Sequence, residues 1–215
     1  MDIKHMADTG FTKQVDKGAY QFGKYTDFNR WSSYFYQIEQ VLKTKPKSVL
    51  EIGEGEGVLR DYLRNNTDTT YTSLDIADDL KADTVGSVLD IPFGNESFGT
   101  VCAFEVLEHL PFEEFEKALG ELSRVSRRSV VLSLPHFGPP VKFLFKIPFL
   151  PEIKIAFKIP YPKKHIFDGQ HYWEIGKVGY PPKRIRKSLE KYFTIKDEFV
   201  PFQNQYHHFY LLEKI

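Results

Sequence analysis

The chain has 215 residues, and its 29 Lys plus Arg balance its 29 Asp plus Glu, which gives a formal net charge of zero. This length suits one domain with its own core and argues against two full domains. The charge balance lacks the basic character of a dedicated nucleic-acid binder, so we do not expect nucleic acid as a partner.

The N-terminal part is polar and dotted with aromatic residues. Residues 1–29 show no steady periodicity, and we expect an arm whose Tyr20, Phe22 and Tyr25 fold over the site as a lid. No apolar leader and no long apolar run is present, so we expect neither a signal peptide nor a membrane span, and we predict a cytoplasmic enzyme.

A regular alternation of helix and strand patterns follows. Apolar spacing over 30–43 predicts an amphipathic helix with Asp27 or Asn29 as its N-cap. Strands and helices that take turns are typical of a parallel sheet covered on both faces, and the last two strands are close enough in sequence for an antiparallel edge hairpin. The predicted strands are 48–52, 71–76, 85–88, 99–104, 129–134, 193–200 and 206–213, and the further predicted helices are 57–64, 111–126 and 182–192.

An insertion over 135–181 interrupts the alternation with eight prolines and with Phe-Lys-Ile-Pro at both 145–148 and 157–160. Between residues 137 and 164 it holds six lysines, one acid and many Phe and Ile residues. We interpret it as a cap over the active site. A surface that rests on anionic lipid is the second interpretation, and packing on the domain core is the third.

The most informative run begins where an apolar strand ends in Glu51 and is followed by Gly53, Gly55 and Gly57. Glycine permits a sharp turn from strand to helix and lets a ligand lie against the main chain. The spacing is neither G-x-G-x-x-G nor a loop ending in G-K-[ST]. Asp75, at the end of the next strand, can accept hydrogen bonds from two ribose hydroxyls, as in NAD-binding folds. These residues indicate an adenosine-containing cofactor.

Three segments together resemble the class I S-adenosylmethionine-dependent methyltransferases of type 11. The first motif of this family is matched by E-x-G-x-G-x-G at 51–57. The family pattern G-D-A-x-x-L-P-F, followed by D-x-S-F-D, is similar to G-S-V-L-D-I-P-F at 86–93 with N-E-S-F at 95–98. The family segment E-V-L-E-H-L is similar to F-E-V-L-E-H-L-P at 104–111. The resemblance implies an α/β, Rossmann-like fold with a mostly parallel seven-stranded sheet, helices on both faces and a reversed strand near one edge. It implies S-adenosylmethionine as cofactor. A single domain is expected over 1–215, with an N-terminal arm and helix (1–45), a cofactor-binding core (46–135), a cap (136–181), and a closing helix and strands (182–215).

The resemblance also implies roles for residues at the matching positions. The methionine end of the cofactor would be shaped by Glu51, Gly53, Gly55 and Gly57, and its ribose would be bound by Asp75. The adenine would pack on Ile76 and meet Ser87 and Val88 at its edge. The sulfonium side would be lined by Phe104 and Glu105. Two residues depart from the pattern. Ser87 replaces a frequent Asp, which weakens the contact to the adenine amino group or moves it to Asp90. Glu54 stands between the first two glycines, where it either contacts the cofactor or points to water, the second being favoured.

Methyl transfer mainly requires that the acceptor be positioned and water excluded, so a general base is optional. His109 and His136 follow the carboxyl ends of strands and are our candidate bases; the alternative is that each anchors a loop. Tyr25, His171 and Trp173 are the expected substrate contacts.

We expect no metal site. His165, Asp168, His171, His207 and His208 could converge, but no H-x-x-x-H or C-x-x-C pair fixes two ligands on one element. The favoured function is methyl transfer to a small or lipid-like acceptor, with peripheral membrane contact through 137–164 and an oligomeric state left open. A noncatalytic module that keeps the fold and a nicotinamide-dependent oxidoreductase are the alternatives.

Overall fold

The computed structural model describes residues 23, 26–77 and 82–215. The expected lid residues Tyr20, Phe22 and Tyr25 lie outside these ranges. Among the described residues, no helix is long and apolar enough to cross a bilayer.

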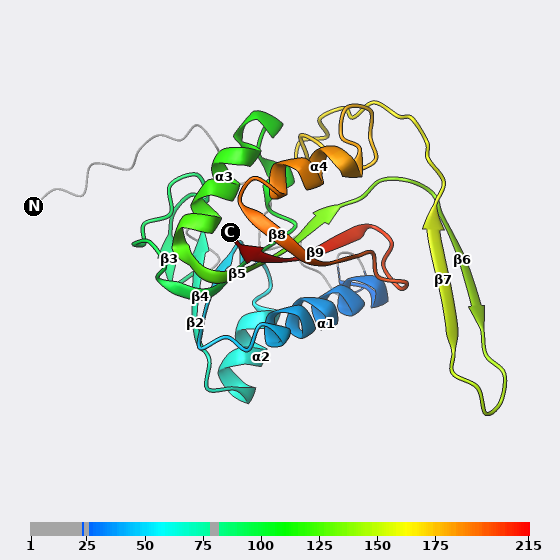
Figure 1. Ribbon diagram of the computed structural model, residues 1–215, viewed down its shortest axis with the longest axis horizontal. Helices are drawn as coiled ribbons and strands as arrows, with labels where there is room; N and C mark the ends of the chain where they lie inside the picture. Colours follow the sequence, from blue (N-terminus) through cyan, green and yellow to red (C-terminus); the bar gives the residue numbers. More distant parts are fainter. Residues whose placement is uncertain (1–22, 24–25, 78–81) are drawn as a thin grey trace, which may run out of the picture.

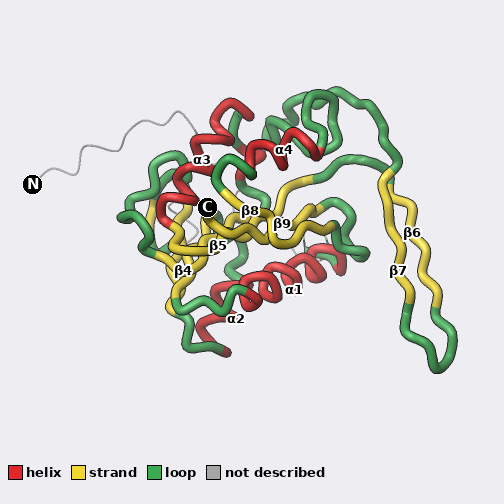
Figure 2. Tube along the Cα trace, viewed as in Figure 1, coloured by secondary structure: helices red, strands yellow, loops and turns green. Residues whose placement is uncertain are grey.

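A seven-stranded sheet with the order β3-β2-β1-β4-β5-β9-β8 forms the centre of the molecule (Figures 1 and 2). Neighbouring strands are parallel except at β9, which runs antiparallel to both β5 and β8. This confirms the predicted fold class, with its reversed strand next to the edge. The strands are β1 (Ser48–Ile52), β2 (Thr70–Asp75), β3 (Thr84–Val85), β4 (Phe98–Phe104), β5 (Ser126–Pro135), β8 (Phe193–Phe199) and β9 (His207–Lys214).

Helices cover both faces of the sheet. Helices α1 (Phe28–Lys43) and α2 (Val58–Asn66) lie on one face, and α3 (Phe112–Val125) and α4 (Pro182–Leu189) lie on the other. Asp27 caps α1, because its Oδ1 accepts the N–H of Arg30 at 2.8 Å. Alternate side chains of β4 enter the two cores, with Val101 on the α3 side and Cys102, fully buried, on the α1 side.

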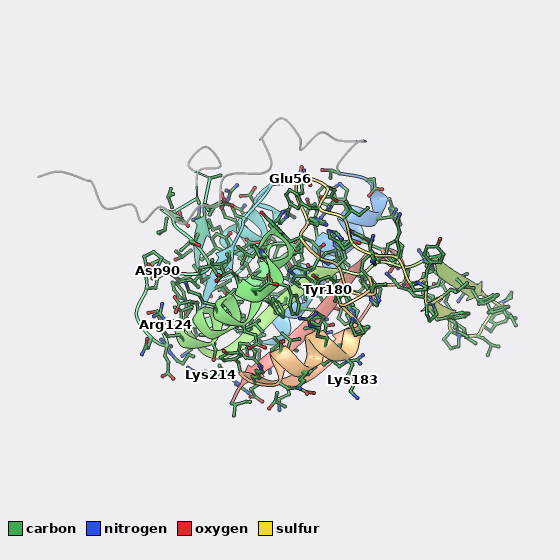
Figure 3. The ribbon with its side chains drawn as sticks, turned by 90° about the horizontal axis from the view of Figure 1, so that it is seen from above. Glu56, Asp90, Arg124, Tyr180, Lys183 and Lys214 are labelled. Atoms are coloured by element: carbon green, nitrogen blue, oxygen red, sulfur yellow. The ribbon has the colours of Figure 1, made fainter. Side chains whose placement is uncertain are left out.

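The insertion forms a separate antiparallel hairpin of β6 (Pro140–Phe145) and β7 (Ile153–Lys158). Figures 1 and 3 show it projecting from the body. Packing on the domain core is therefore wrong for these strands, because most of their side chains are exposed. The cap over the active site stays a prediction. The strands pair only with each other and place their apolar residues outside the reach of the main sheet. The hairpin touches the domain through Lys142 and Lys154, which contact the loop before β9.

Candidate cofactor and acceptor site

The glycine loop turns at the carboxyl end of β1 through backbone that favours glycine. Gly53, Gly55 and Gly57 have φ values of +73°, +52° and +74°. A Cβ on Gly53 would lie 2.5 Å from Cγ2 of Val106, so the loop passes directly against the turn that follows β4. The loop is also tied to α1, since Glu56 accepts hydrogen bonds from the hydroxyls of Tyr34 and Thr26.

Glu54 does not point to water, contrary to our expectation. Its side chain is 1% exposed, and Oε1 lies 3.0 Å from Nη1 of Arg60 in the first turn of α2. Arg60 therefore neutralises a carboxylate that would otherwise be desolvated without compensation. The second carboxylate oxygen of Glu54, Oε2, is buried and has no hydrogen-bond partner among the described residues. A polar atom is thus left unsatisfied inside the cofactor loop.

Glu51 is also buried, at the end of β1, where the hydroxyl of Tyr71 donates a hydrogen bond to Oε2. Burial raises the pKa of Glu51 to about 8, so the carboxyl is largely protonated at neutral pH. A cationic group brought beside it would favour ionisation.

The ribose and adenine positions follow β2. Asp75 is 8% exposed, and its Oδ1 accepts the N–H of Ala77 at 2.9 Å. Ile76, next to it, leaves 41% of its surface exposed at this edge. An acid beside an exposed apolar side chain suits a ribose followed by an adenine ring.

The residues at the expected adenine edge are less open. The hydroxyl of Ser87 accepts the N–H of Leu89 at 3.1 Å and so closes its own turn. Val88 is buried in the core, which leaves its main chain rather than its side chain for a ligand. Asp90 is exposed at the other end of this turn.

Two residues end β4 on the side of the reactive centre. Phe104 is buried on the α1 side of the sheet. Glu105 adopts φ +55°, which is rare for a residue with a side chain and marks a locally strained turn. Burial raises the pKa of Glu105 to about 7.

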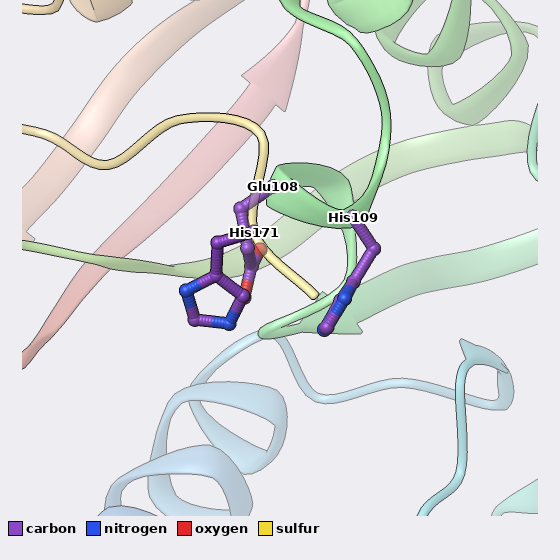
Figure 4. Close-up of side chains that lie close together, drawn as sticks. All are labelled: Glu108, His109 and His171. Carbon is purple, nitrogen blue, oxygen red and sulfur yellow. The ribbon is translucent and has the colours of Figure 1, made fainter. Parts of the chain in front are cut away.

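The turn after Glu105 brings Glu108 and His109 beside His171 from the return segment, as Figure 4 shows. Nδ1 of His109 lies 3.1 Å from the carbonyl oxygen of Gln170; a carbonyl only accepts, so Nδ1 carries the proton. Burial lowers the pKa of His109 to about 4, which keeps the ring neutral at pH 7. Its role as a base stays a prediction.

His136 lies on another part of the edge. Its Nδ1 is 3.0 Å from Nδ1 of His208, whose Nε2 is 2.9 Å from the carboxylate of Glu198. Burial lowers the pKa of His136 to about 3. The chain of contacts matches the alternative interpretation, a histidine that anchors a loop, and catalysis by His136 is likewise only a prediction.

Of the expected substrate contacts, the structure places His171 at the site and removes Trp173 from it. Trp173 is fully buried, donates its indole N–H to the carbonyl of Leu110 and packs on Phe112 and Phe115. Tyr25 lies outside the described residues. Sequence reasoning missed Tyr206, whose hydroxyl donates to Glu174 at 2.8 Å beside His171, because nothing in its local pattern marks it.

Tyr206 also lines a cleft of about 600 Å³ between the start of α1, the base of the hairpin and the loop before β9. This volume suits a small organic molecule. The surface of the cleft is mostly apolar, although many of the lining residues carry polar groups, two of them lysines: Asn29, His136, Phe137, Gly138, Pro139, Pro140, Lys142, Lys158, Tyr161, Gln203, Asn204, Gln205 and Tyr206.

Residues 50–134, which carry the glycine loop, Asp75 and the turn after β4, match a sequence family described as a methyltransferase domain. This match, together with the fold, supports a methyltransferase. Its cofactor is S-adenosylmethionine, and the residues present fit that molecule: a loop of three left-handed glycines, a carboxylate at the end of β2 and an unsatisfied carboxylate oxygen inside the loop.

Solved structures share the fold of this chain. A protein from Pyrococcus horikoshii OT3 matches with a TM-score of 0.60 and 14% identity over 94% of this chain and 100% of the other. The 1,6-didemethyltoxoflavin-N1-methyltransferase of Burkholderia thailandensis, bound to S-adenosylhomocysteine, matches with a TM-score of 0.58 and 14% identity over 86% and 80%. The magnesium protoporphyrin IX methyltransferase of Synechocystis PCC 6803, also with that product bound, has a TM-score of 0.58 and 14% identity over 88% and 89%. No curated protein sequence matches significantly.

Proposed function

We propose that this methyltransferase acts on a small, lipid-like acceptor that it meets at an anionic membrane surface, and that the β6–β7 hairpin is its membrane contact. The observation that carries the proposal is the composition of the two hairpin faces. Directly paired residues of an antiparallel hairpin share a face. The pairs Val141 with Phe157, Phe143 with Ile155 and Phe145 with Ile153 therefore form one face without a polar side chain.

This apolar face points away from the body. Lys142 and Lys154 belong to the opposite face, where their Nζ atoms lie 5.5 and 6.0 Å from the ring centroid of Phe202 in the loop before β9. Lys142 also donates to the carbonyl of Gln203. Since the lysine face contacts the domain, the large apolar side chains of the other face are about half exposed. Such a contiguous patch indicates an interaction surface.

The tip of the hairpin extends the same character. Phe149 is fully exposed, and Ile147 and Leu150 are more than half exposed beside Lys146. Aromatic and aliphatic groups that enter the interface, with lysines near the headgroups, match an anionic bilayer. The six lysines and single acid between 137 and 164 support that charge preference.

The base of the hairpin supports an apolar acceptor. Pro139, Pro140, Lys142 and Lys158 form part of the cleft wall, so one element joins the outer surface to the cleft. The toxoflavin and protoporphyrin methyltransferases with this fold are named for small-molecule acceptors, which supports the same class here. When bound, S-adenosylmethionine supplies an activated methyl group. The residues of the chain orient the acceptor and exclude water from it.

Vesicle sedimentation with the full chain tests the membrane contact. Binding to vesicles of phosphatidylcholine with phosphatidylglycerol is expected to exceed binding to phosphatidylcholine alone. Phe145→Ser with Phe149→Ser should weaken it about tenfold or more, because burying one Phe contributes about 1.5–3 kcal/mol. Phe35→Ser, which changes a Phe that is 61% exposed on α1, is the matched control and should bind as the unmodified chain does.

Transfer of a labelled methyl group from S-adenosylmethionine into a lipid extract, compared with a water-soluble metabolite extract, tests the acceptor. Absence of vesicle binding, or equal loss in the control variant, would refute the membrane contact. A change of oligomeric state in the hairpin variant would instead show that the apolar face joins two copies of the chain.

A further inference from the structure

We propose that Glu108, His109 and His171 form a binding site for a divalent first-row transition-metal ion, on the acceptor side of the cofactor loop. The site reverses our expectation from the sequence. Of the histidines considered there, only His171 belongs to the proposed site: His165 contacts the carbonyl of His171, and His207 and His208 contact Glu105 and Glu198.

The three side chains are close enough to share one ion. One ligand atom of each lies within 4.8 Å of the others, and Nε2 of His171 is 3.9 Å from Oε1 of Glu108. Atoms bound to one ion at about 2.1 Å stand about 3–4 Å apart, so the pair of His171 and Glu108 is already within this range, and the wider separations have to shorten by about an ångström. Figure 4 shows the three side chains close together, with Glu108 and His171 overlapping in this view and His109 beside them.

The carboxylate of Glu108 is a second, independent observation that favours a bound metal ion. Its side chain is fully buried, and neither carboxylate oxygen has a hydrogen-bond partner among the described residues. Buried carboxylates are normally paired, hydrogen-bonded or bound to a metal. The distance of 3.9 Å to His171 is too long for a hydrogen bond but suits two ligands of one ion.

Both histidines are oriented as metal ligands usually are. Because Nδ1 of His109 donates to the carbonyl of Gln170, the lone pair of the ring is on Nε2. Nδ1 of His171 faces Oε1 of Glu174 at 3.5 Å, which places its lone pair on the Nε2 that faces Glu108. A ligating histidine commonly donates its other N–H to a carbonyl or a carboxylate in this way.

A second set, Asp168, His171 and Glu174, shares one histidine, but its carboxylates already have hydrogen-bond or ion-pair partners. Oδ1 of Asp168 accepts the backbone N–H groups of Gln170 and His171 at 3.0 and 2.9 Å. Glu174 accepts the hydroxyl of Tyr206 and lies 3.6 Å from Nζ of Lys177. Oε2 of Glu174 has no hydrogen-bond partner among the described residues, but it faces this lysine, whereas both oxygens of Glu108 lack a hydrogen bond. The set that contains Glu108 is therefore the one whose carboxylate is wholly without hydrogen bonds.

The charge around the site also favours a cation. Glu105, Glu108 and Glu174 act on one another electrostatically, while Arg30, from α1, is the arginine that acts on Glu105 and Glu108. Two imidazole nitrogens and one carboxylate suit Zn²⁺, Mn²⁺, Fe²⁺ or Co²⁺ better than Ca²⁺ or Mg²⁺, which prefer oxygen ligands.

Three protein ligands leave coordination positions open. Val106, in the same turn, touches the cofactor loop at Gly53, so an oxygen or nitrogen atom of the acceptor could fill such a position near the cofactor. This role rests on the proposed function, whereas the binding of the ion does not.

The test uses the full chain, stripped with a chelator, without cofactor or acceptor. Titration with Mn²⁺, followed by the electron paramagnetic resonance signal of the free ion, is expected to show saturable binding. Glu108→Gln and His171→Gln should each weaken binding by at least about 100-fold, since even outer-sphere partners contribute about 10–100-fold. Asp168→Asn, from the second set, is the matched control and should leave the affinity nearly unchanged, because Asn keeps an oxygen that can accept the backbone N–H groups of Gln170 and His171.

Measurements on the unmodified chain guard against variants that fail to fold. Bound Mn²⁺ is expected to broaden the ring NMR signals of His109 and His171 before those of His136 and His208. Lack of saturable binding, or equal binding by both ligand variants, overturns the proposal. Loss of binding in Asp168→Asn alone assigns the ion to the other set and overturns it as well. None of these outcomes depends on methyl transfer or on membrane contact.

Discussion

Gly53 is the position in the cofactor loop where a side chain is expected to be most damaging. Its φ is +73°, and an added Cβ would lie 2.5 Å from Cγ2 of Val106. A left-handed conformation costs a non-glycine residue about 1–2 kcal/mol, and overpacking a tight contact costs about 1–3 kcal/mol. We therefore expect Gly53→Ala to lower the free energy of unfolding by about 2–5 kcal/mol.

The two contributions can be separated. In a Val106→Ala background the overlap disappears, so Gly53→Ala should cost only the backbone term of about 1–2 kcal/mol. Gly179→Ala is the matched control, because Gly179 has φ +93° and an added Cβ would meet nothing within 4 Å. It should show the same backbone cost and no effect on the cofactor loop.

Urea denaturation measures the unfolding free energies, and titration calorimetry with S-adenosylhomocysteine measures binding. Gly53→Ala should weaken binding, and Gly179→Ala should not. If Gly53→Ala lowers the free energy of unfolding equally in the unmodified chain and in the Val106→Ala background, the overlap with Val106 is refuted. A cost no greater than that of Gly179→Ala would refute the whole argument.

Three further outcomes are expected. Asp75→Asn keeps the oxygen that accepts the Ala77 N–H but loses the charge, so calorimetry should show affinity for S-adenosylhomocysteine reduced about 10–100-fold, as for the loss of 1.5–3 kcal/mol from a charged hydrogen bond. Glu51 has a pKa raised to about 8 by burial, so the folded state holds an extra proton between its ordinary pKa of 4.5 and 8. The free energy of unfolding is therefore highest below pH 4.5 and falls by on the order of a few kcal/mol as the pH rises to 8. Glu51→Gln should remove this fall, as measured by urea denaturation at several pH values. Arg60→Met leaves the buried carboxylate of Glu54 without its cation and should lower the free energy of unfolding by about 3 kcal/mol. The double substitution Glu54→Met with Arg60→Met should lower it less, and an equal loss in the two variants would contradict the pairing.

The order of strands and helices could be predicted because each main element carries a local signal. Apolar runs end in Glu51, Asp75 and Glu105, and these acids mark the carboxyl edge of the sheet. The orientation of the hairpin could not be predicted. A strand whose one face is apolar looks the same in sequence whether that face meets the core or solvent, and only the contacts of Lys142 and Lys154 with Phe202 reveal which face turns inward.

The site was predictable where spacing sets its geometry and unpredictable where folding brings distant residues together. The glycine loop belongs to the first kind. Trp173 was misplaced because it follows His171 in an irregular segment, whereas its ring fits a gap between Leu110 and α3. The proximity of Glu108 to His171 depends on the path of the whole return segment, which no local pattern records.

The hydrogen bonds from Tyr34 and Thr26 to Glu56 connect the cofactor loop to the start of α1. Asn29, in the first turn of that helix, lines the cleft. The cofactor loop and the cleft therefore share a structural element, so we expect a shift of the loop to move the cleft wall. Because a coupling free energy is reciprocal, whatever factor the cofactor adds to affinity for the acceptor, the acceptor adds to affinity for the cofactor.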